Sequence, residues 1–289
     1  MALQSPGLIK AANDALVGVS ADINILTDFA VDFSADFAEF GSTVRVPVVT
    51  ATADEQNDSA NDYEADSGNV TYVNVTLNRH PKSTFAAPAA AVLDAPNAPY
   101  WAKVKTACVD AVGGRISSSF GALFTKEACT GAAVTLATVT AATVSALRAR
   151  CLGRVGNTVL ALGPVEYAAL LGCLDSGTYG GGEAIRTGKI PGLYGFKAVA
   201  CLRDLPAGII GALIPSDAVA VAGRGTIPDA RPYLEAETII DENGFPLSVT
   251  RHFSPGKRKE FLNVDLNWGG AIIQGSKIAL INPPEQAQG

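Results

Sequence analysis

Apolar residues recur at helical spacing over one long stretch of the chain, residues 100–124. Those that share one face lie three or four positions apart: Val104, Cys108, Val112, Ile116, Phe120 and Leu123. The segment just before this stretch, residues 95–99, contains two prolines and is typical of a helix start. The pattern therefore predicts a helix over residues 100–124, the longest in the chain.

Two strand-like runs precede this helix, at residues 43–50 (TVRVPVVT) and 70–77 (VTYVNVTL). In the second run, Val73, Val75 and Leu77 alternate onto one face. Pro47 cannot donate a ladder hydrogen bond, so the first run is expected at an edge. The residues between the runs are polar and acidic, which predicts a long hairpin with a polar tip. A two-stranded hairpin is marginal by itself, so this one is expected to lie against a partner.

The first forty residues are expected to form an arm with one short amphipathic helical segment. Phe29, Phe33, Phe37 and Phe40 recur there at helical spacing among acidic residues. A short helix of this kind is unstable alone, so it needs a surface to lie on.

Short strands and helices alternate from about residue 130 onward, which indicates a compact α/β unit. Thr140 is expected to cap a helix that reaches about residue 152. A short buried strand is expected at residues 157–161, and Pro164 is expected in the first turn of a helix that ends near residue 171.

The pattern continues with strands at residues 197–201 and 207–214. Ser216 and Asp217 resemble a helix start, so a short helix is expected over residues 218–222. The end of the chain returns to strand patterns, at residues 246–252, 259–267 and 277–281.

Composition and charge exclude several classes of protein. The chain has 289 residues, of which 48% are hydrophobic and 17% charged, so it is expected to fold around a large core. Its net charge is -6 and it shows no basic face, so a protein that binds nucleic acid by itself is not indicated.

The most basic segment, residues 251–259, is interpreted as a solvated loop. No signal peptide is expected, and the uncharged segment 128–147 is too rich in small and hydroxyl residues for a membrane span.

No pattern in the sequence predicts a catalytic, cofactor-binding or metal-binding site. The five cysteines are widely spaced without a CxxC pair, so neither zinc nor a disulfide framework is expected. His80 and His252 have no neighbours at metal-ligand spacing. The glycine-rich segment 177–182 is interpreted as a loop, and Asp241 and Glu242 as a turn. An enzyme of α/β type remains an alternative, but it would need convergent titratable residues.

The order of these parts resembles the major capsid proteins of tailed bacteriophages, which have the Hong Kong 97 fold. That order is an arm, a long hairpin, a long helix, a glycine-rich α/β unit and closing strands. Residues 73–80 (VNVTLNRH) resemble the strand that leaves the family's E-loop hairpin. Residues 160–171 (LALGPVEYAALL) resemble a strand and helix of the axial domain, and residues 188–196 (GKIPGLYGF) resemble a turn into a strand. The resemblance covers about residues 20–282.

The resemblance implies an α+β capsid fold with five segments. These are an N-terminal arm (1–40), an E-loop hairpin (41–80), a peripheral domain with a long spine helix (81–129), an α/β axial domain (130–245), and closing strands of the peripheral domain with a C-terminal tail (246–289). Some family members form a covalent cross-link through an E-loop lysine. Residues 46–78 contain no lysine, so this chemistry is not expected from the hairpin.

The function implied is that of a structural protein and not of an enzyme, with no cofactor. Copies would assemble as pentamers and hexamers into an icosahedral head shell, in the cytoplasm of a bacterial host. The virion shell would enclose double-stranded DNA without sequence-specific binding, and its partners would be a separate scaffolding protein, a portal and a decoration protein. No membrane contact is expected. Two alternatives stay open: the shell protein of an encapsulin-like nanocompartment, and another phage structural protein of the tail or decoration type.

Overall fold

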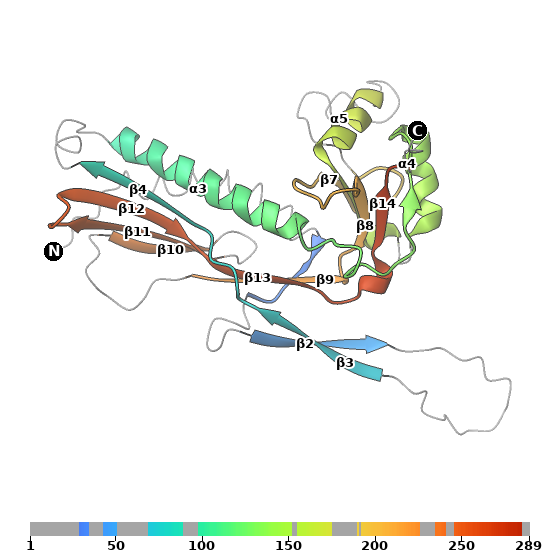
Figure 1. Cartoon of the computed structure of the whole chain (residues 1–289), viewed down its shortest axis with the longest axis horizontal. Helices are drawn as coiled ribbons and strands as arrows, with labels where there is room; N and C mark the ends of the chain where they lie inside the picture. The colour runs from blue at the N-terminus through green and yellow to red at the C-terminus, as the bar shows by residue number, and fades with distance from the viewer. Residues whose placement is uncertain are drawn as a thin grey trace.

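The computed structural model of the chain describes residues 29–34, 43–50, 69–88, 98–151, 155–174, 190, 192–225, 235–240 and 246–284. Figure 1 shows a long helix beside a sheet, a smaller unit of strands and short helices, and a hairpin below both. This mixture of helix and sheet agrees with the α+β class expected from the sequence.

The long helix α3 (Ala98–Gly121) runs lengthwise along a four-stranded antiparallel sheet (Figure 1). The strands of this sheet, in spatial order, are β10 (Glu235–Ile240), β11 (Pro246–Ser254), β12 (Lys259–Asp265) and β4 (Lys82–Pro88). The helix contacts β4 and β12. The predicted apolar stripe faces the core, because four of its members are buried and Val104 and Leu123 are half-buried. The helix prediction is confirmed, except that the helix ends at Gly121 and Leu123 follows it.

A five-stranded mixed sheet forms the smaller unit. Its strands, in spatial order, are β5 (Val134–Thr135), β14 (Ala279–Asn282), β8 (Gly211–Pro215), β6 (Thr158–Leu162) and β7 (Ala198–Cys201). The central strand β6 is buried along its whole length. Its alternate residues enter two cores: Leu160 and Leu162 pack with the short helices, whereas Val159 and Ala161 join the core around α3.

The two short helices of this unit begin where the sequence predicts. Helix α4 (Ala141–Leu147) has Thr140 as its N-cap, and the Thr140 hydroxyl accepts a hydrogen bond from the Thr143 backbone N–H at 3.3 Å. In return, the Thr143 hydroxyl accepts from the Thr140 backbone N–H at 2.8 Å. The α-helix ends at Leu147 and passes into a 3₁₀ turn, so it is shorter than expected. Helix α5 (Pro164–Cys173) follows the N-cap Gly163 with proline in its first turn.

A small three-stranded sheet lies between the two larger ones. It consists of β1 (Val31–Asp32), β9 (Val219–Arg224) and β13 (Asn267–Ile272), with β9 in the middle. The expected helix over residues 218–222 is therefore wrong. A short apolar run that is buried on both faces shows no alternation, and pairing on both sides selects the strand. Ser216 does not cap a helix; its hydroxyl donates to Asn157 Oδ1 at 2.5 Å.

The expected helical segment of the arm is also wrong at Val31 and Asp32, which form β1 and pair in parallel with β9. Phe29 is fully buried, with its ring centroid 5.8 Å from that of Phe120. Phe29 is helical in the structure, and its burial against Phe120 accounts for an apolar residue at this position. Phe37 and Phe40 lie outside the described residues.

The closing strands are distributed among three sheets. β11 and β12 lie in the sheet beneath α3, whereas β13 pairs with β9, and β14 pairs with β8 and β5. The end of the chain therefore ties the sheet under α3 to the α/β unit. β13 is a separate strand that the sequence pattern did not predict.

Candidate assembly surface

The hairpin of β2 (Thr43–Thr50) and β3 (Asn69–Thr76) has two different faces. The strands pair in register from Thr43 with Thr76 to Thr50 with Asn69, and residues directly opposite each other share a face. One face carries the buried residues Val46, Val48 and Val75. This face anchors the hairpin to the rest of the chain.

The buried face packs on the small central sheet. Val46 and Val75 form a cluster with Ala220 and Ala222 of β9. The approach between the two sheets is very close at Gly269 of β13, where an added Cβ would lie 2.1 Å from the Thr76 carbonyl oxygen. Only glycine fits at this position without a shift of the backbone.

The other face of the hairpin presents apolar side chains to solvent. Val49 is 63% exposed, Tyr72 59% and Val70 48%. Val49 lies directly opposite Val70, and Tyr72 directly opposite Pro47, so these four residues form one contiguous patch, called here the outer patch. Arg45 lies at its edge, with its guanidinium carbon 5.4 Å from the Tyr72 ring centroid. Within the described residues, both strands also leave their outer backbone edges unpaired.

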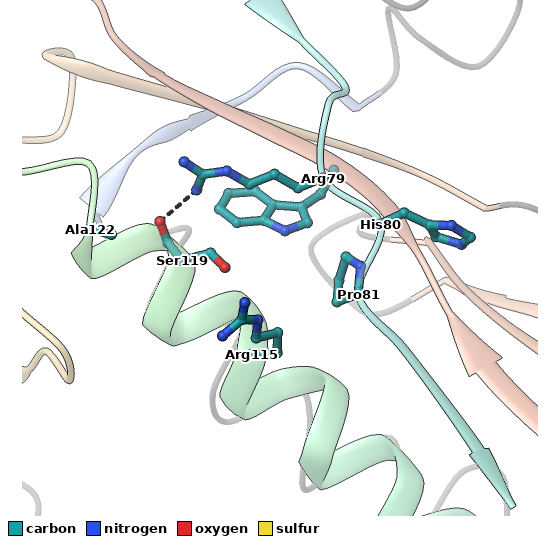
Figure 2. A pocket seen from close by; sticks show the side chains of 7 residues that line it. Arg79, His80, Pro81, Arg115, Ser119 and Ala122 are labelled. Carbon is teal, nitrogen blue, oxygen red and sulfur yellow. Dashed lines mark hydrogen bonds between the residues drawn. The ribbon is translucent and has the colours of Figure 1, made fainter.

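A second feature lies where the chain leaves the hairpin. Arg79 and Trp268 form an isolated antiparallel bridge, with the guanidinium carbon of Arg79 5.1 Å from the indole centroid. Arg79 Nη1 donates to the Ser119 carbonyl oxygen at 2.5 Å (Figure 2). Arg79, Ser119 and Trp268 border a hollow of about 400 Å³ together with Arg115 of α3. Partial burial lowers the pKa of Arg79 from its usual value.

The residues that the sequence singled out do not converge on a chemical site. His80 Nε2 pairs with Asp265 Oδ2 at 2.9 Å, and His252 stacks on Phe261 with ring centroids 5.1 Å apart. The part of the chain that the structure describes contains no cluster of His, Cys, Asp and Glu able to hold a metal ion. The glycine-rich segment 177–182 and the pair Asp241 and Glu242 lie outside the described residues.

All five cysteines are described, and all are free. Burial raises the pKa of Cys129 to about 12, and it also raises the pKa of Cys151 and Cys201. No helix among the described residues is long and apolar enough to cross a membrane.

Sequence reasoning predicted the hairpin and its buried face, but it missed the outer patch. Val75 is buried and Val73 and Leu77 are half-buried, as the alternation predicted. The signal for the second face was present in the apolar residues Val70 and Tyr72, which precede Val73 and alternate onto the opposite face of the strand. Strands with apolar residues on both faces are typical of sheets that are covered on both sides.

No protein-family model matches the sequence, and no curated protein matches it. Solved structures do match in fold. A chain of the capsid of the Cyanophage P-SCSP1u is 10% identical with a TM-score of 0.58, over 90% of this chain and 88% of that one. A chain of the mature capsid of bacteriophage PhiM1 is 8% identical with a TM-score of 0.56, over 90% and 86%. A chain of the capsid of an empty GTA particle is 14% identical with a TM-score of 0.53, over 89% and 88%. The chain therefore has the α+β fold of these capsid structures over about nine tenths of its length.

Proposed function

We propose that the chain is the major capsid protein of a tailed bacteriophage, a subunit that assembles with copies of itself into an icosahedral head shell. The shared fold makes this function the first candidate. The observation that carries it is the outer patch, because an exposed apolar face on a projecting hairpin is stable when another surface covers it.

A second copy of the chain is the partner that fits the outer patch best. The hairpin is already held on one side by β9 and β13, so it presents the patch in a fixed orientation. Contact with a neighbour would bury Val49, Val70 and Tyr72, and it would also protect the unpaired strand edges. Apolar surface buried between two copies then takes the place of the hydrophobic core that a two-stranded hairpin lacks by itself.

The elements take their roles from this proposal. The hairpin is the E-loop, α3 is the spine helix of the peripheral domain, and the five-stranded unit with α4 and α5 belongs to the axial domain. In this proposal the arm ends at residue 40, the E-loop hairpin at 80, the first peripheral segment at 129 and the axial domain at 245. The closing strands and the tail follow. Wedge-shaped axial domains would meet around five-fold and six-fold axes through head-to-tail contacts that close by rotation.

The proposed shell encloses double-stranded DNA by containment, in agreement with a net charge of -6. Its further partners would be a scaffolding protein, a portal and a decoration protein, with assembly in the host cytoplasm. The role is structural and not enzymatic. A lysine-based cross-link is not expected from residues 46–78, because that segment has no lysine.

Electron microscopy and sedimentation of the purified protein test this proposal. The wild type is expected to form closed shells, tubes, or isolated pentamers and hexamers. The variant Tyr72→Lys, which places a charge in the outer patch, is expected to shift the protein toward monomers. Thr71→Lys places the same charge at an exposed position of the same strand, outside the outer patch, and serves as the matched control, with assembly retained. A wild type that stays monomeric at high concentration, even with scaffolding protein supplied, would contradict the proposal.

A further inference from the structure

The hollow beside the Arg79–Trp268 bridge collects hydrogen-bond donors from three parts of the chain. Arg79 comes from the segment between β3 and β4, Arg115 and Ser119 come from α3, and Trp268 comes from β13. Figure 2 shows the Arg79 and Arg115 side chains converging on the turn of α3 at Ser119. The His80 side chain points away from both arginines.

The positive charge of this hollow is not neutralised within the described part of the chain. Neither Arg79 nor Arg115 forms an ion pair with a described carboxylate. Asp265 pairs at 2.9 Å with His80, whose side chain points away from both arginines (Figure 2). Two guanidinium groups with no described carboxylate beside them in one hollow are unusual in a chain with a net charge of -6. A bound anion would relieve their mutual repulsion.

An unpartnered donor in the same wall is independent evidence for a ligand. Trp268 is fully buried, and its Nε1 has no hydrogen-bond acceptor among the described residues. A buried indole N–H nearly always has an acceptor, because leaving it unpaired costs free energy. Trp268 lines the hollow, so an oxyanion that enters it and displaces the atoms covering Nε1 would supply that acceptor.

We propose that this hollow binds a phosphate group. The donors approach from a helix, a strand and a connecting segment, and they therefore suit an anion whose oxygens point in several directions. A carboxylate has two oxygens in one plane, which a single arginine can satisfy. Free phosphate and the phosphate of a nucleic-acid backbone present the same oxyanion, and the experiment below separates these two sources. This inference does not depend on the proposed assembly function.

The test measures binding of inorganic phosphate to the full-length protein by calorimetry at constant ionic strength. The variant Arg115→Gln removes an exposed guanidinium from the hollow without touching the core. We expect it to weaken phosphate binding at least about tenfold, since one charge-assisted hydrogen bond is lost. Arg150→Gln removes another exposed arginine, from the 3₁₀ turn after α4, and it should bind phosphate like the wild type.

Two further measurements make the outcome decisive. Arg115→Lys keeps the charge but loses the bidentate guanidinium donor. A phosphate affinity between those of the wild type and Arg115→Gln supports the proposed geometry. The second measurement uses a short fluorescein-labelled single-stranded DNA oligonucleotide. If the oligonucleotide binds and Arg115→Gln weakens its binding, while inorganic phosphate does not bind, the phosphate group comes from nucleic acid. The proposal is overturned if neither probe binds in an Arg115-dependent way, or if acetate binds as tightly as phosphate.

Discussion

Arg79 and Trp268 are joined by two backbone hydrogen bonds, from Arg79 N to Trp268 O at 3.1 Å and from Trp268 N to Arg79 O at 2.9 Å. Their side chains stack over the same bridge. Arg79 lies three residues after the end of β3, and Trp268 lies in β13, next to the glycine that approaches Thr76. The bridge and the glycine contact together fix the base of the hairpin, and they set the direction in which the outer patch faces.

The variant Gly269→Ala is expected to loosen the base of the hairpin. Its added Cβ would lie 2.1 Å from the Thr76 carbonyl oxygen, so the backbone of β13 or of β3 must move. We expect a loss of about 1–3 kcal/mol in the free energy of unfolding, as for other overpacked sites. Urea unfolding measures this loss, and limited proteolysis of the hairpin reports where the structure has opened.

Gly114→Ala is the matched control, because a Cβ at this position in α3 meets no atom within 4 Å. Alanine is the better helix former, so this variant should gain about 0.5–1 kcal/mol. Equal losses for both variants would show that the close approach at Gly269 does not limit the hairpin.

The Thr140 cap is expected to contribute measurably to the α/β unit. Thr140→Ala removes the hydroxyl that accepts from the Thr143 backbone N–H, and the unfolding free energy should fall by about 1 kcal/mol. Ser145→Ala changes an exposed hydroxyl residue in the middle of the same helix and should be neutral or slightly stabilising. Thermal unfolding followed by circular dichroism compares the two, and a neutral Thr140→Ala would show that the cap is dispensable.

Local signals predicted several elements well. The apolar stripe of α3, the Thr140 cap and Pro164 each depend on neighbours within a few residues, and each lies where the sequence placed it. The failures involve pairing between distant segments. β9 was expected as a helix because Ser216 and Asp217 resemble a helix start, but its strand state follows from pairing with β1 and β13.

The outer patch and the phosphate hollow could be predicted only in part. Strand alternation placed Val75 correctly, but exposure of Tyr72 depends on which face meets the central sheet. Arg79, Arg115 and Trp268 come together because the chain end returns as β13, beside the connection that follows the hairpin. No spacing in the sequence encodes that meeting.

Cysteine reactivity should follow burial. Cys173 is exposed at the end of α5, whereas Cys108 is 5% and Cys129 3% exposed. A thiol reagent such as Ellman's reagent needs access to a thiolate, so we expect Cys173 to react first in the native protein and the two buried thiols only after unfolding. Cys173→Ser should abolish the fast phase, and a fast phase that survives this change would contradict the burial pattern.

Stability should fall in alkali partly because of Cys129. Burial raises the pKa of its thiol to about 12 in the folded chain, whereas an unfolded cysteine has a pKa of about 8.5. Above about pH 8.5 the unfolded state releases this proton while the folded state keeps it, so unfolding becomes more favourable as pH rises toward 12. Below about pH 8.5 both states are protonated, and the contribution does not change with pH.

Cys129→Ala removes this dependence while other alkaline titrations remain in both proteins. The difference in unfolding free energy between wild type and variant, measured in urea at a series of pH values, should therefore stay constant below about pH 8.5 and shrink above it. A difference that stays constant into alkali would mean that the Cys129 thiol ionises as readily in the folded chain as in the unfolded one. In that case water reaches Cys129 in the core beside α3, and the burial argument fails at this position.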